Sequence, residues 1–505
     1  MTPSFHKRQP MDPRKAIVIG AGAGGLTAAA HLARSGMQVT VVEKNECAGG
    51  RCARVVREGH TFDAGPTLYV MPKLFEQEFA ALGVSARDRL DLQRVDPTYH
   101  LVFDDGQRLT LTSDMQRMQS QLEAMEAGSF AHFKQYLEQG GRHYNLAMDH
   151  IVCRNFRTLA EFLNPASLQV FLKVGALTPH YAGMRRFFHA ERLKAAFTFQ
   201  DMYMGLSPFE APSTFSMMQY TELADGVWYP RGGMYAVVMA LQEAAERLGA
   251  EFAFGTPVER IVTRDGRAQG VVLGDGRYLP ADIVVANADL PYVYRNLLPD
   301  RAAARRLDRL QYSCSTINFM WATDRPYPEL PAHLLFLSDD FQANFDAIQH
   351  DLTIAANPSV YIHAPTRLDP GMAPGGHDTL VGIVPVGHID EAHPQDWADL
   401  KARARRTLLQ RLASVGVTDL EAHLKFEMSF TPPDWQRHFN LAKGATHGLS
   451  HRLMQMGYFR PHNRHARYRN LYFAGASTHP GTGLPTALVS GRLVAERIAE
   501  DMARG

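Results

Sequence analysis

The first regular pattern along the chain is a short apolar run at residues 15–19 that leads directly into a glycine-rich segment at residues 20–25. A β-branched run of this length predicts a buried strand, and the alanine- and leucine-rich continuation to residue 33 predicts a helix. A second β-branched run at residues 37–42 predicts another strand. Strand, turn, helix and strand in this order are typical of a βαβ unit, so the pattern predicts an α/β fold.

The pattern changes after residue 100, where two apolar runs flank an Asp-Gly turn signal. Residues 100–103 and 108–111 therefore predict a hairpin. Between residues 115 and 205, apolar positions recur at helical spacing with few glycines, which predicts a mostly helical insert. The helices expected in this insert are residues 116–127, 129–146, 156–162, 168–177 and 190–204.

Strand patterns return in the second half of the chain. Residues 300–430 mix strands with one long helix, which predicts an α+β domain. An apolar strand at residues 471–475 precedes a loop and a closing helix at residues 485–502. The other strands expected here are residues 251–254, 258–263, 270–273, 282–287, 315–322, 359–363 and 379–386, and the other helices are residues 234–249 and 397–414.

The composition is that of a globular protein with several domains. A chain of 505 residues is too long for one simple core, so two or three domains are expected. Hydrophobic residues make up 45% and charged residues 21%, which is ordinary for a folded chain. The net charge of +1 produces no overall field that attracts nucleic acid, so we expect no nucleic-acid partner.

The four cysteines, at positions 47, 52, 153 and 314, form no C-x-x-C pair and no cluster with zinc spacing, so we expect no metal site. So few cysteines indicate a reducing compartment.

The sequence gives no sign of a secretory signal or a membrane span. The polar first 13 residues lack the apolar core of a secretory signal. Residues 16–33 are nearly uncharged, but their glycines fit strand, turn and helix better than a membrane span. We therefore expect a cytoplasmic protein whose membrane contact is peripheral, at the inner face.

Gly20, Gly22 and Gly25 match the dinucleotide fingerprint G-x-G-x-x-G. The first glycine permits the tight turn, the second lets a pyrophosphate approach the backbone, and the third lets helix and strand pack closely. Glu43 lies 23 residues after Gly20, where a carboxylate accepts hydrogen bonds from an adenosine ribose. This acid favours FAD or NAD over NADP. An ordinary βαβ unit whose glycines serve only packing is the alternative.

A second glycine turn separates FAD from NAD. Gly50 and Arg51 follow Glu43 closely, in a region where a nicotinamide dehydrogenase normally returns to another strand and helix. Backbone amides and a guanidinium at this place approach a second face of a pyrophosphate. A surface cation beside a turn is the alternative for Arg51.

Four further segments, residues 226–233, 281–289, 458–464 and 475–485, read GVWYPRGG, ADIVVANAD, YFRPHNR and GASTHPGTGLP. Together with the glycine fingerprint they resemble the flavin-dependent amine oxidase superfamily and, more narrowly, the bacterial and fungal type of phytoene desaturase. The likeness extends over residues 14–503. The two C-terminal segments are far more specific than the glycine fingerprint, which unrelated oxidoreductases share.

The resemblance implies FAD as the cofactor. It implies a discontinuous Rossmann-type FAD-binding domain of the glutathione-reductase kind, an α+β substrate domain, and a helical, membrane-facing insert. The FAD-binding parts are expected at residues 14–100, 226–298 and 441–505, the insert at residues 101–225 and the substrate domain at residues 299–440.

The resemblance also implies the residues of the site. The start of the last helix is expected beneath the flavin ring, where its positive end stabilises negative charge on the reduced flavin. Many relatives carry an aspartate for the ribityl chain where this chain has Ala476, which leaves those contacts unassigned. His479 is the candidate catalytic residue, and a structural hydrogen bond is the alternative. The expected cofactor-binding residues are Gly20, Gly22, Gly25, Glu43, Lys44, Gly50, Arg51, Gly65, Pro66, Thr67, Val258, Asn287, Gly475, Ala476, Gly483, Leu484 and Pro485.

The implied activity is an FAD-dependent desaturation that introduces C=C bonds into a long apolar isoprenoid polyene such as phytoene, by hydride transfer to the flavin. Oxygen or a quinone is the expected electron acceptor. The same flavin motifs fit two alternatives. One is a redox cyclase that acts on a polyketide-derived polyene of the polycyclic tetramate macrolactam type, and the other is a non-catalytic flavin-binding partner protein.

Residues 195–220 are rich in methionine and aromatic side chains. They suit the lining of a tunnel for a long polyene, and core packing between two domains is the alternative. Four acidic residues of the central region are candidate proton acceptors, with a solvated helix face as the alternative for each. They are Glu191, Asp201, Glu210 and Glu222.

A polyene dissolved in lipid gains almost nothing on entering an apolar tunnel, whereas crossing water costs about 0.8 kcal/mol per methylene. The mouth of such a tunnel is therefore expected to dock on a bilayer. Residues 168–188 combine apolar side chains with Lys173, Arg185 and Arg186 and predict a docking face. An ordinary amphipathic helix is the alternative.

Overall fold

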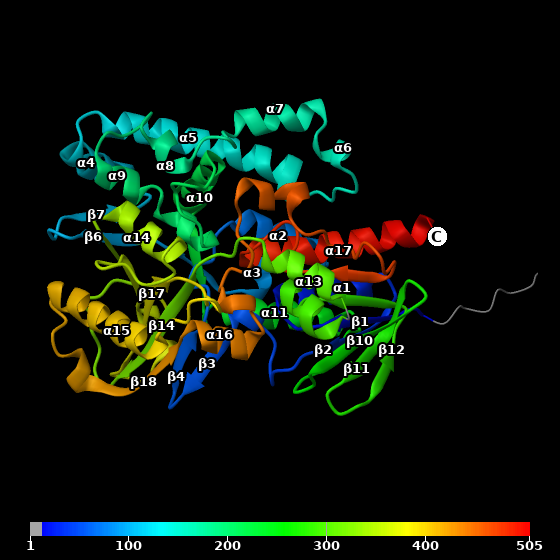
Figure 1. Cartoon of the computed structure of the whole chain (residues 1–505). Coiled ribbons are helices and arrows are strands. Elements are labelled where there is room, and N and C mark those ends of the chain that lie inside the picture. The colour runs from blue at the N-terminus through cyan, green and yellow to red at the C-terminus, as the bar shows by residue number, and fades with distance from the viewer. Residues whose placement is uncertain (1–12, 299, 505) are drawn as a thin grey trace, which may run out of the picture.

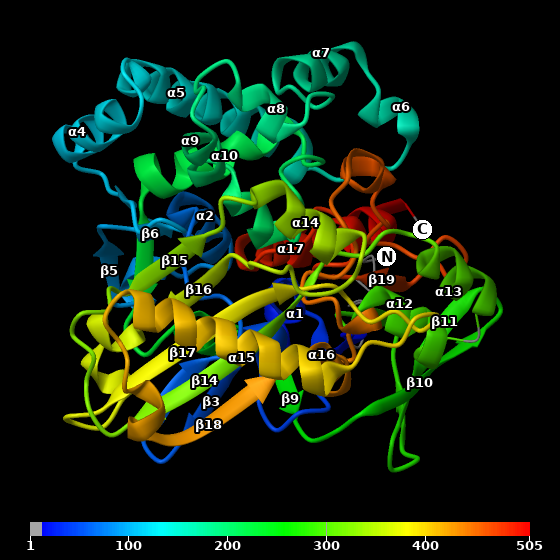
Figure 2. The ribbon, with the colours of Figure 1, turned by 60° about the vertical axis from the view of Figure 1, so that its left-hand side comes forward.

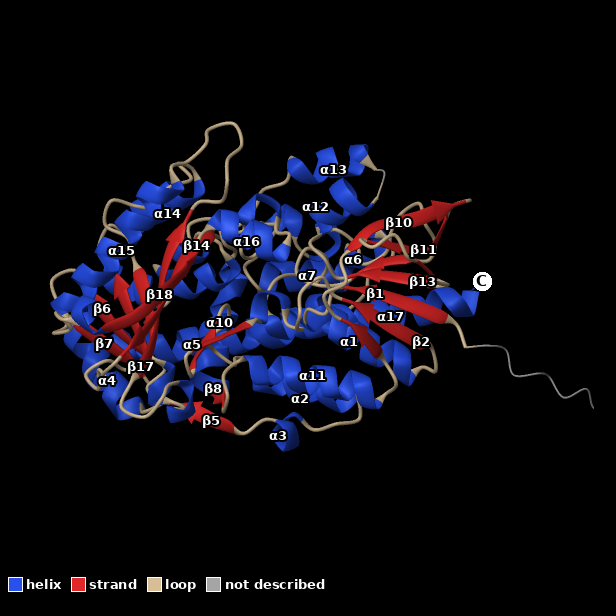
Figure 3. Cartoon of the chain, turned by 90° about the horizontal axis from the view of Figure 1, so that it is seen from below, coloured by secondary structure: helices blue, strands red, loops and turns tan. Residues whose placement is uncertain are grey.

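The computed structural model describes residues 13–298 and 300–504 (Figure 1). The polar segment for which we expect no secretory signal therefore lies almost wholly outside the described residues. In the described part, a five-stranded and a seven-stranded sheet lie at opposite ends of the molecule, with helices between them (Figure 3). No helix in residues 13–298 or 300–504 combines the length and the apolar character that crossing a bilayer requires.

The five-stranded sheet is parallel and runs in the order β19-β13-β1-β2-β9. Its strands come from three segments that are distant in sequence, which confirms the predicted α/β fold with a discontinuous Rossmann-type sheet. The strands are β1 (Lys15–Ile19), β2 (Gln38–Val42), β9 (Glu251–Ala253), β13 (Ile283–Ala286) and β19 (Leu471–Phe473).

Alternating residues of these strands serve two hydrophobic cores, because successive side chains of a strand point to opposite faces. Ala16 and Val18 pack with α1 (Ala23–Arg34), α11 (Tyr235–Arg247) and α17 (Leu484–Arg504). Ile17 and Ile19 pack on the other face, against a three-stranded antiparallel sheet and a short helix. These are β10 (Val258–Arg264), β11 (Arg267–Leu273), β12 (Tyr278–Pro280) and α13 (Arg301–Asp308).

The seven-stranded sheet is mixed and runs in the order β18-β14-β17-β16-β15-β6-β7. The predicted hairpin is present as β6 and β7, and β6 pairs parallel with β15, more than 200 residues later. Helix α15 (Trp397–Ser414) covers one face through Leu400, Leu408 and Leu412. The strands are β6 (Tyr99–Phe103), β7 (Arg108–Leu111), β14 (Ser315–Thr323), β15 (His333–Leu337), β16 (Val360–His363), β17 (Asp378–Val386) and β18 (Leu424–Phe430).

The insert forms a helical layer above both sheets (Figures 1 and 2). Several of its predicted helices are shorter than expected, and the one expected at 156–162 begins only at Leu159. The helix expected at 168–177 ends at Lys173 because Gly175 adopts φ +64°, and the one expected at 190–204 ends at Ala196 and is followed by a 3-10 segment, η3 (Phe199–Met204). The layer comprises α4 (Met115–Met125), α5 (Ser129–Ala147), α6 (Leu159–Phe162), α7 (Pro165–Lys173), α8 (His180–Met184), α9 (Glu191–Ala196) and α10 (Ser216–Tyr220).

Smaller elements connect these layers, and the sequence pattern does not predict most of them. They are β3 (Arg54–Arg57), β4 (His60–Asp63), β5 (Leu92–Val95), β8 (Val227–Pro230), α2 (Pro72–Ala81), α3 (Ala86–Arg89), α12 (Leu290–Tyr292), α14 (Phe341–Gln349) and α16 (Pro432–Phe439).

Helices α1 and α17 approach each other closely through two glycines. A Cβ atom on Gly491 would lie 2.5 Å from the carbonyl oxygen of Gly24 and 2.8 Å from the amide nitrogen of Ala28. Backbone therefore faces backbone at this crossing, which places the N-termini of both helices beside the carboxyl ends of β1 and β19.

We expect Gly491→Val to separate α1 from α17 and to destabilise the protein by about 1–3 kcal/mol, since the added carbons meet backbone atoms that cannot rotate away. Thermal unfolding monitored by circular dichroism measures the change. Gly375→Ala is the matched control, because a Cβ there meets open space. Equal unfolding midpoints for both variants would contradict the close-contact interpretation.

Candidate active site

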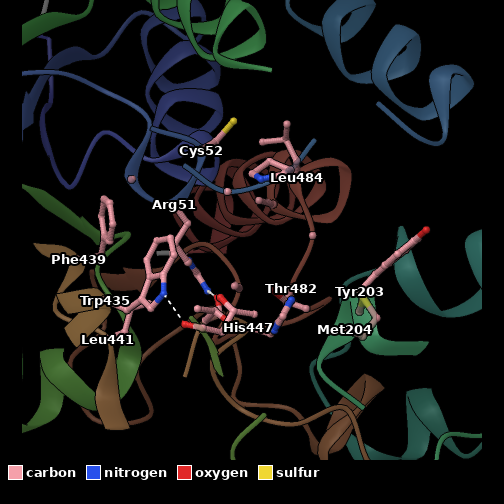
Figure 4. A pocket seen from close by; sticks show the side chains of 18 of the residues that line it. Arg51, Cys52, Tyr203, Met204, Trp435, Phe439, Leu441, His447, Thr482 and Leu484 are labelled. Atoms are coloured by element: carbon pink, nitrogen blue, oxygen red, sulfur yellow. Dashed lines mark hydrogen bonds between the residues drawn. The ribbon is translucent and has the colours of Figure 1, made fainter. Parts of the chain in front are cut away.

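A cavity of about 530 Å³ lies between the two large sheets, at the carboxyl ends of the parallel strands (Figure 4). One half is lined by the loops that follow β1, β2, β13 and β19, and the other by side chains from the helical layer and the seven-stranded sheet. Seen in close-up, Trp435 and Phe439 of α16 lie on one side, Tyr203 and Met204 of η3 on the other, and Leu484 at the start of α17 lies between them.

The glycine fingerprint packs on one side chain, Asn287, at the end of β13. A Cβ on Gly22 would lie 2.7 Å from Asn287 Oδ1, and one on Gly475 would lie 2.6 Å from Asn287 Nδ2. Asn287 Nδ2 also donates a hydrogen bond to the carbonyl oxygen of Ala474 at 3.0 Å. A Cβ on Gly25 would lie 2.1 Å from the carbonyl oxygen of Gly20, so Gly25 serves the close packing of helix and strand. Gly25 is the one predicted cofactor residue that does not line the cavity.

The carboxylate of Glu43 is buried at the end of β2 and lines the cavity. Its Oε2 accepts a hydrogen bond from the Ala21 amide at 2.8 Å, and its Oε1 accepts one from the Asn45 amide at 2.9 Å. A carboxylate has about four lone-pair sites, so two acceptor positions remain for ribose hydroxyls. Lys44 also lines the cavity, and its Nζ donates to the Arg437 carbonyl and to Asn440 Oδ1.

Arg51 is half-buried and lines the cavity, so it is not a surface cation. Its Nη1 donates to the Thr446 carbonyl at 3.0 Å, and burial lowers its pKa although the nearby Asp289 carboxylate opposes that change. The loop of Gly65, Pro66 and Thr67 lies against it, since a Cβ on Gly65 would be 2.0 Å from the Arg51 carbonyl oxygen. This pair of loops lies beside the fingerprint, because the Gly49 amide donates a hydrogen bond to the Ala21 carbonyl at 2.9 Å.

The other side of this half is the loop from β19 to α17. Gly475, Ala476, Gly483, Leu484 and Pro485 all line the cavity, and Gly475 and Gly483 have φ of +107° and +113°, which favours glycine. The N-termini of α1 and α17 therefore face one cavity, where unpaired amides and the helix dipoles bind anions. Val258 of β10 also lines the cavity, and its backbone contact with the adenine end stays a prediction.

Two buried side chains hold this loop, and the sequence analysis did not single them out. Arg460 is only 1% exposed and donates hydrogen bonds to five carbonyl oxygens, including those of Ala476 and Thr478. Burial lowers its pKa to about 9. His451 Nε2 accepts a hydrogen bond from the Thr482 amide at 3.0 Å. The signal for Arg460 was present, because it stands inside the motif at residues 458–464.

His479 lies outside the cavity lining. It is buried, its Nε2 donates to the Arg154 carbonyl at 2.9 Å, and its ring lies edge-on to Phe156. Burial lowers its pKa to about 4, so it stays neutral at physiological pH. These contacts favour the structural alternative, in which this histidine anchors the C-terminal loop to the helical layer.

The second half of the cavity is apolar. Methionine and aromatic side chains of residues 199–218 line it, as the tunnel hypothesis expects, and so do residues of α14 and β15. Among the described residues of this half, three tyrosines are titratable, Tyr99, Tyr203 and Tyr361, and the titratable ring of His447 lies at its border, against Gly205. Tyr361 Oη lies 2.8 Å from Thr67 Oγ1 and 2.6 Å from His333 Nδ1, which joins this half to the loop of Gly65, Pro66 and Thr67. The apolar side chains that line this half are Phe199, Met202, Met204, Met217, Met218, Leu335, Leu337, Phe341, Phe345 and Ile348.

These features fit an extended dinucleotide that carries a redox ring. The cradle is formed by glycines whose side chains would fill it, by two helix N-termini and by a ribose-binding acid. When bound, FAD accepts a hydride from a substrate carbon. In residues 13–298 and 300–504, no group of three or more His, Cys, Asp or Glu side chains is arranged to hold a metal ion.

The fold and the cradle define a flavoprotein of the Rossmann type, and comparisons with known proteins give its family. The family described as flavin containing amine oxidoreductase matches residues 23–499. The phytoene desaturase of Fusarium fujikuroi is 42% identical over 511 residues, covering 97% of this chain and 90% of that protein. The zeta-carotene-forming phytoene desaturase of Myxococcus xanthus is 44% identical over 488 residues, covering 96% and 94%.

Solved structures show the same fold at low identity. An oxidoreductase from Methanosarcina mazei has a TM-score of 0.65 at 17% identity and covers 95% of this chain and 100% of its own. A putrescine oxidase bound to putrescine has a TM-score of 0.64 at 16% identity, covering 97% and 100%. The chain belongs to the flavin containing amine oxidoreductase family and is an FAD-dependent oxidoreductase.

We expect Gly22→Ala to weaken FAD binding at least about tenfold, because the fingerprint requires a residue without a side chain where a pyrophosphate approaches the backbone. A competing reason is the contact with Asn287, since the new methyl group would lie 2.7 Å from Asn287 Oδ1. Flavin fluorescence during titration of the apoprotein measures the affinity. The double variant Gly22→Ala/Asn287→Ala removes the protein atom nearest to the methyl group. Recovery of affinity in the double variant would show that the contact with Asn287, and not the pyrophosphate, is the reason for the loss.

Proposed function

We propose that this chain is an FAD-dependent desaturase that introduces C=C bonds into a long isoprenoid polyene such as phytoene. The observation that carries the proposal is the composition of the cavity: the charged side chains that line it belong to the cofactor half, and the described lining of the other half carries none. An amine substrate requires a compensating acid, whereas a hydrocarbon requires only apolar surface. The names of the relatives at 42% and 44% identity support the same substrate class.

The cavity walls support the reaction in a simple way. Apolar side chains exclude water from the polyene and hold it by contact alone, and the loop of Gly65, Pro66 and Thr67 adjoins both halves of the cavity. Oxygen or a quinone is the proposed acceptor of the electrons. No feature of the described residues favours a redox cyclase or a non-catalytic partner protein.

We further propose that the protein docks on a membrane surface through an exposed apolar patch formed by residues 159–177, which include α6 and α7, and by residues 453–459. Seven large hydrophobic side chains are exposed there, and Leu172 and Leu177 are 69% and 76% exposed. Phe162 of α6 packs on Tyr458 and Phe459, so these segments form one surface. The seven are Leu159, Leu163, Leu168, Leu172, Leu177, Met454 and Phe459.

This patch differs in part from the expected docking face. Tyr181, Phe187 and Phe188 are buried in the core of the helical layer, where they cannot reach lipid. Lys173, Arg185 and Arg186 are exposed and suit anionic headgroups. Met456, inside the patch segment, packs against the same hydrophobic cluster as Met204 and Met217 of the cavity lining. The patch therefore lies where a polyene passes from lipid into the cavity without crossing water.

The test of the activity is incubation of the FAD-loaded protein with phytoene in liposomes, followed by mass spectrometry of the extracted pigment. We expect products that have lost pairs of hydrogen atoms. A flavin-loaded protein that returns phytoene unchanged, with oxygen and with a quinone, would contradict the desaturase proposal.

We expect the double variant Leu172→Glu/Leu177→Glu to bind liposomes roughly a hundredfold more weakly, since each exposed leucine contributes about 1.5–3 kcal/mol on burial in lipid. Liposome flotation measures the binding, and the flavin absorbance reports the folded state. Met239→Glu is the matched control, because Met239 is 52% exposed on α11, away from the patch. A double variant that floats like the wild type would overturn the docking proposal.

A further inference from the structure

Desaturation removes a hydride and a proton, and the cofactor takes only the hydride. The described lining of the apolar half carries no carboxylate, and burial lowers the pKa of His447, the histidine of the cavity wall, to about 4, which makes it a weak proton acceptor at neutral pH. The hydroxyl groups of the wall are then the acceptors that the substrate can reach, and three of them belong to tyrosines: Tyr99, Tyr203 and Tyr361. The group that contacts each hydroxyl on the side away from the cavity therefore decides where the proton goes.

Behind Tyr99 and Tyr203 lies Glu222. The hydroxyls of Tyr99 and Tyr203 are hydrogen-bonded to each other, and Tyr203 lies against the Glu222 carboxyl. Glu222 is 1% exposed, so it is not on a solvated helix face. Its Oε2 accepts a hydrogen bond from Gln200 Nε2 at 3.2 Å, whereas its Oε1 has no hydrogen-bond partner among the described residues. A buried carboxyl oxygen without a donor costs free energy, which indicates a role other than stability.

The local backbone also sets Glu222 apart. It lies in a π-helical turn, η5 (Thr221–Asp225), directly after α10, and π turns are frequent at functional sites. Helix α10 is pressed onto α5, since a Cβ on Gly140 would lie 2.6 Å from the Ser216 carbonyl oxygen. This close packing fixes the position of α10 and therefore of Glu222, which follows it directly.

We propose that Glu222 is the proton acceptor of the desaturation, acting through the hydroxyl of Tyr203. This inference rests on the proposed function. After hydride removal, the C–H bond on the neighbouring substrate carbon breaks and its electron pair becomes the second half of the C=C bond. The proton bonds to the Tyr203 oxygen while the phenolic proton of Tyr203 moves to the Glu222 carboxylate. Tyr203 thus touches the substrate, and Glu222 is a positioning residue that stores the proton.

The electrostatics agree with this assignment. Burial raises the pKa of Glu222 from 4.5 to about 7, although hydrogen bonds from Tyr203 and Gln200 oppose the rise. The negative charge of the Glu222 carboxylate acts on four tyrosines, Tyr99, Tyr136, Tyr203 and Tyr361. All four stay neutral, because burial raises their pKa. Behind Tyr361 stands His333, whose pKa burial holds well below 6.5, so it is a much weaker proton acceptor at neutral pH.

The first experiment follows stability and needs no substrate. A carboxyl whose folded pKa is raised binds its proton more tightly in the folded than in the unfolded state. Its contribution is therefore complete below the unfolded pKa of 4.5 and is lost as the pH rises through about 7. We expect Glu222→Gln to unfold at a higher temperature than the wild type at about pH 8, with no such gain at about pH 4. Equal midpoints at both pH values would overturn the inference.

The second experiment follows a single turnover of flavin reduction by phytoene in liposomes, as a function of pH. We expect the wild-type rate to rise with pH through about 7. Glu222→Gln should react about a hundredfold more slowly, with this rise abolished. Tyr203→Phe should be similarly slow, and Glu222→Asp should recover the pH dependence. Tyr144→Phe is the control for loss of a tyrosine hydroxyl, because Tyr144 lies outside the cavity lining.

Two outcomes separate the inference from the proposed function. If the wild type leaves phytoene unchanged, the proposed function is wrong and the proton-acceptor role fails with it. If the wild type converts phytoene and Glu222→Gln shows the same rate and pH profile, only the inference is overturned.

Discussion

The site depends on how closely backbone can approach backbone at the carboxyl ends of the parallel strands. Asn287 is the centre of this contact, because a Cβ atom would lie 2.7 Å from its side-chain amide if added to Gly22 and 2.6 Å from it if added to Gly475. A side chain at any of these glycines would separate β1, β13 and β19 at the edge where the cofactor binds. Gly24 and Gly491 extend the same constraint to the helices α1 and α17. The two helix N-termini face one cavity as a consequence.

Buried polar groups then fix the loops that the glycines leave free. Glu43 accepts two backbone amides, Arg460 donates to five carbonyls, and His451 accepts the Thr482 amide. These bonds hold the backbone of the loops in place without a ligand. In the substrate half, one carboxyl oxygen of Glu222 has no hydrogen-bond partner among the described residues.

The two halves of the cavity also explain how one family fold accommodates different substrates. The strand-end loops of the five-stranded sheet carry the cofactor chemistry, and the seven-stranded sheet with the helical layer supplies the substrate wall. In this chain that wall consists largely of methionine and aromatic side chains. Met456 of the exposed patch packs against the same hydrophobic cluster as Met204 and Met217 of this wall. An apolar substrate wall suits a water-insoluble substrate, since it contains no charged group that such a substrate would leave unpaired.

The sequence by itself determined the cofactor cradle, because its requirements are local: a glycine at a tight turn, an acid after a strand and a proline at a helix start are visible in a few residues. All but one of the predicted cofactor residues line the cavity, and Gly25 packs as its position in the fingerprint requires. Only the tertiary structure showed the surroundings of His479, Arg460 and Glu222. Whether a histidine faces a carbonyl or a cavity, and whether an acid on a helix faces water or tyrosines, depends on segments hundreds of residues apart or on helix packing. Strands such as β15, which pairs with β6, were missed for the same reason, since their partners are distant in the chain.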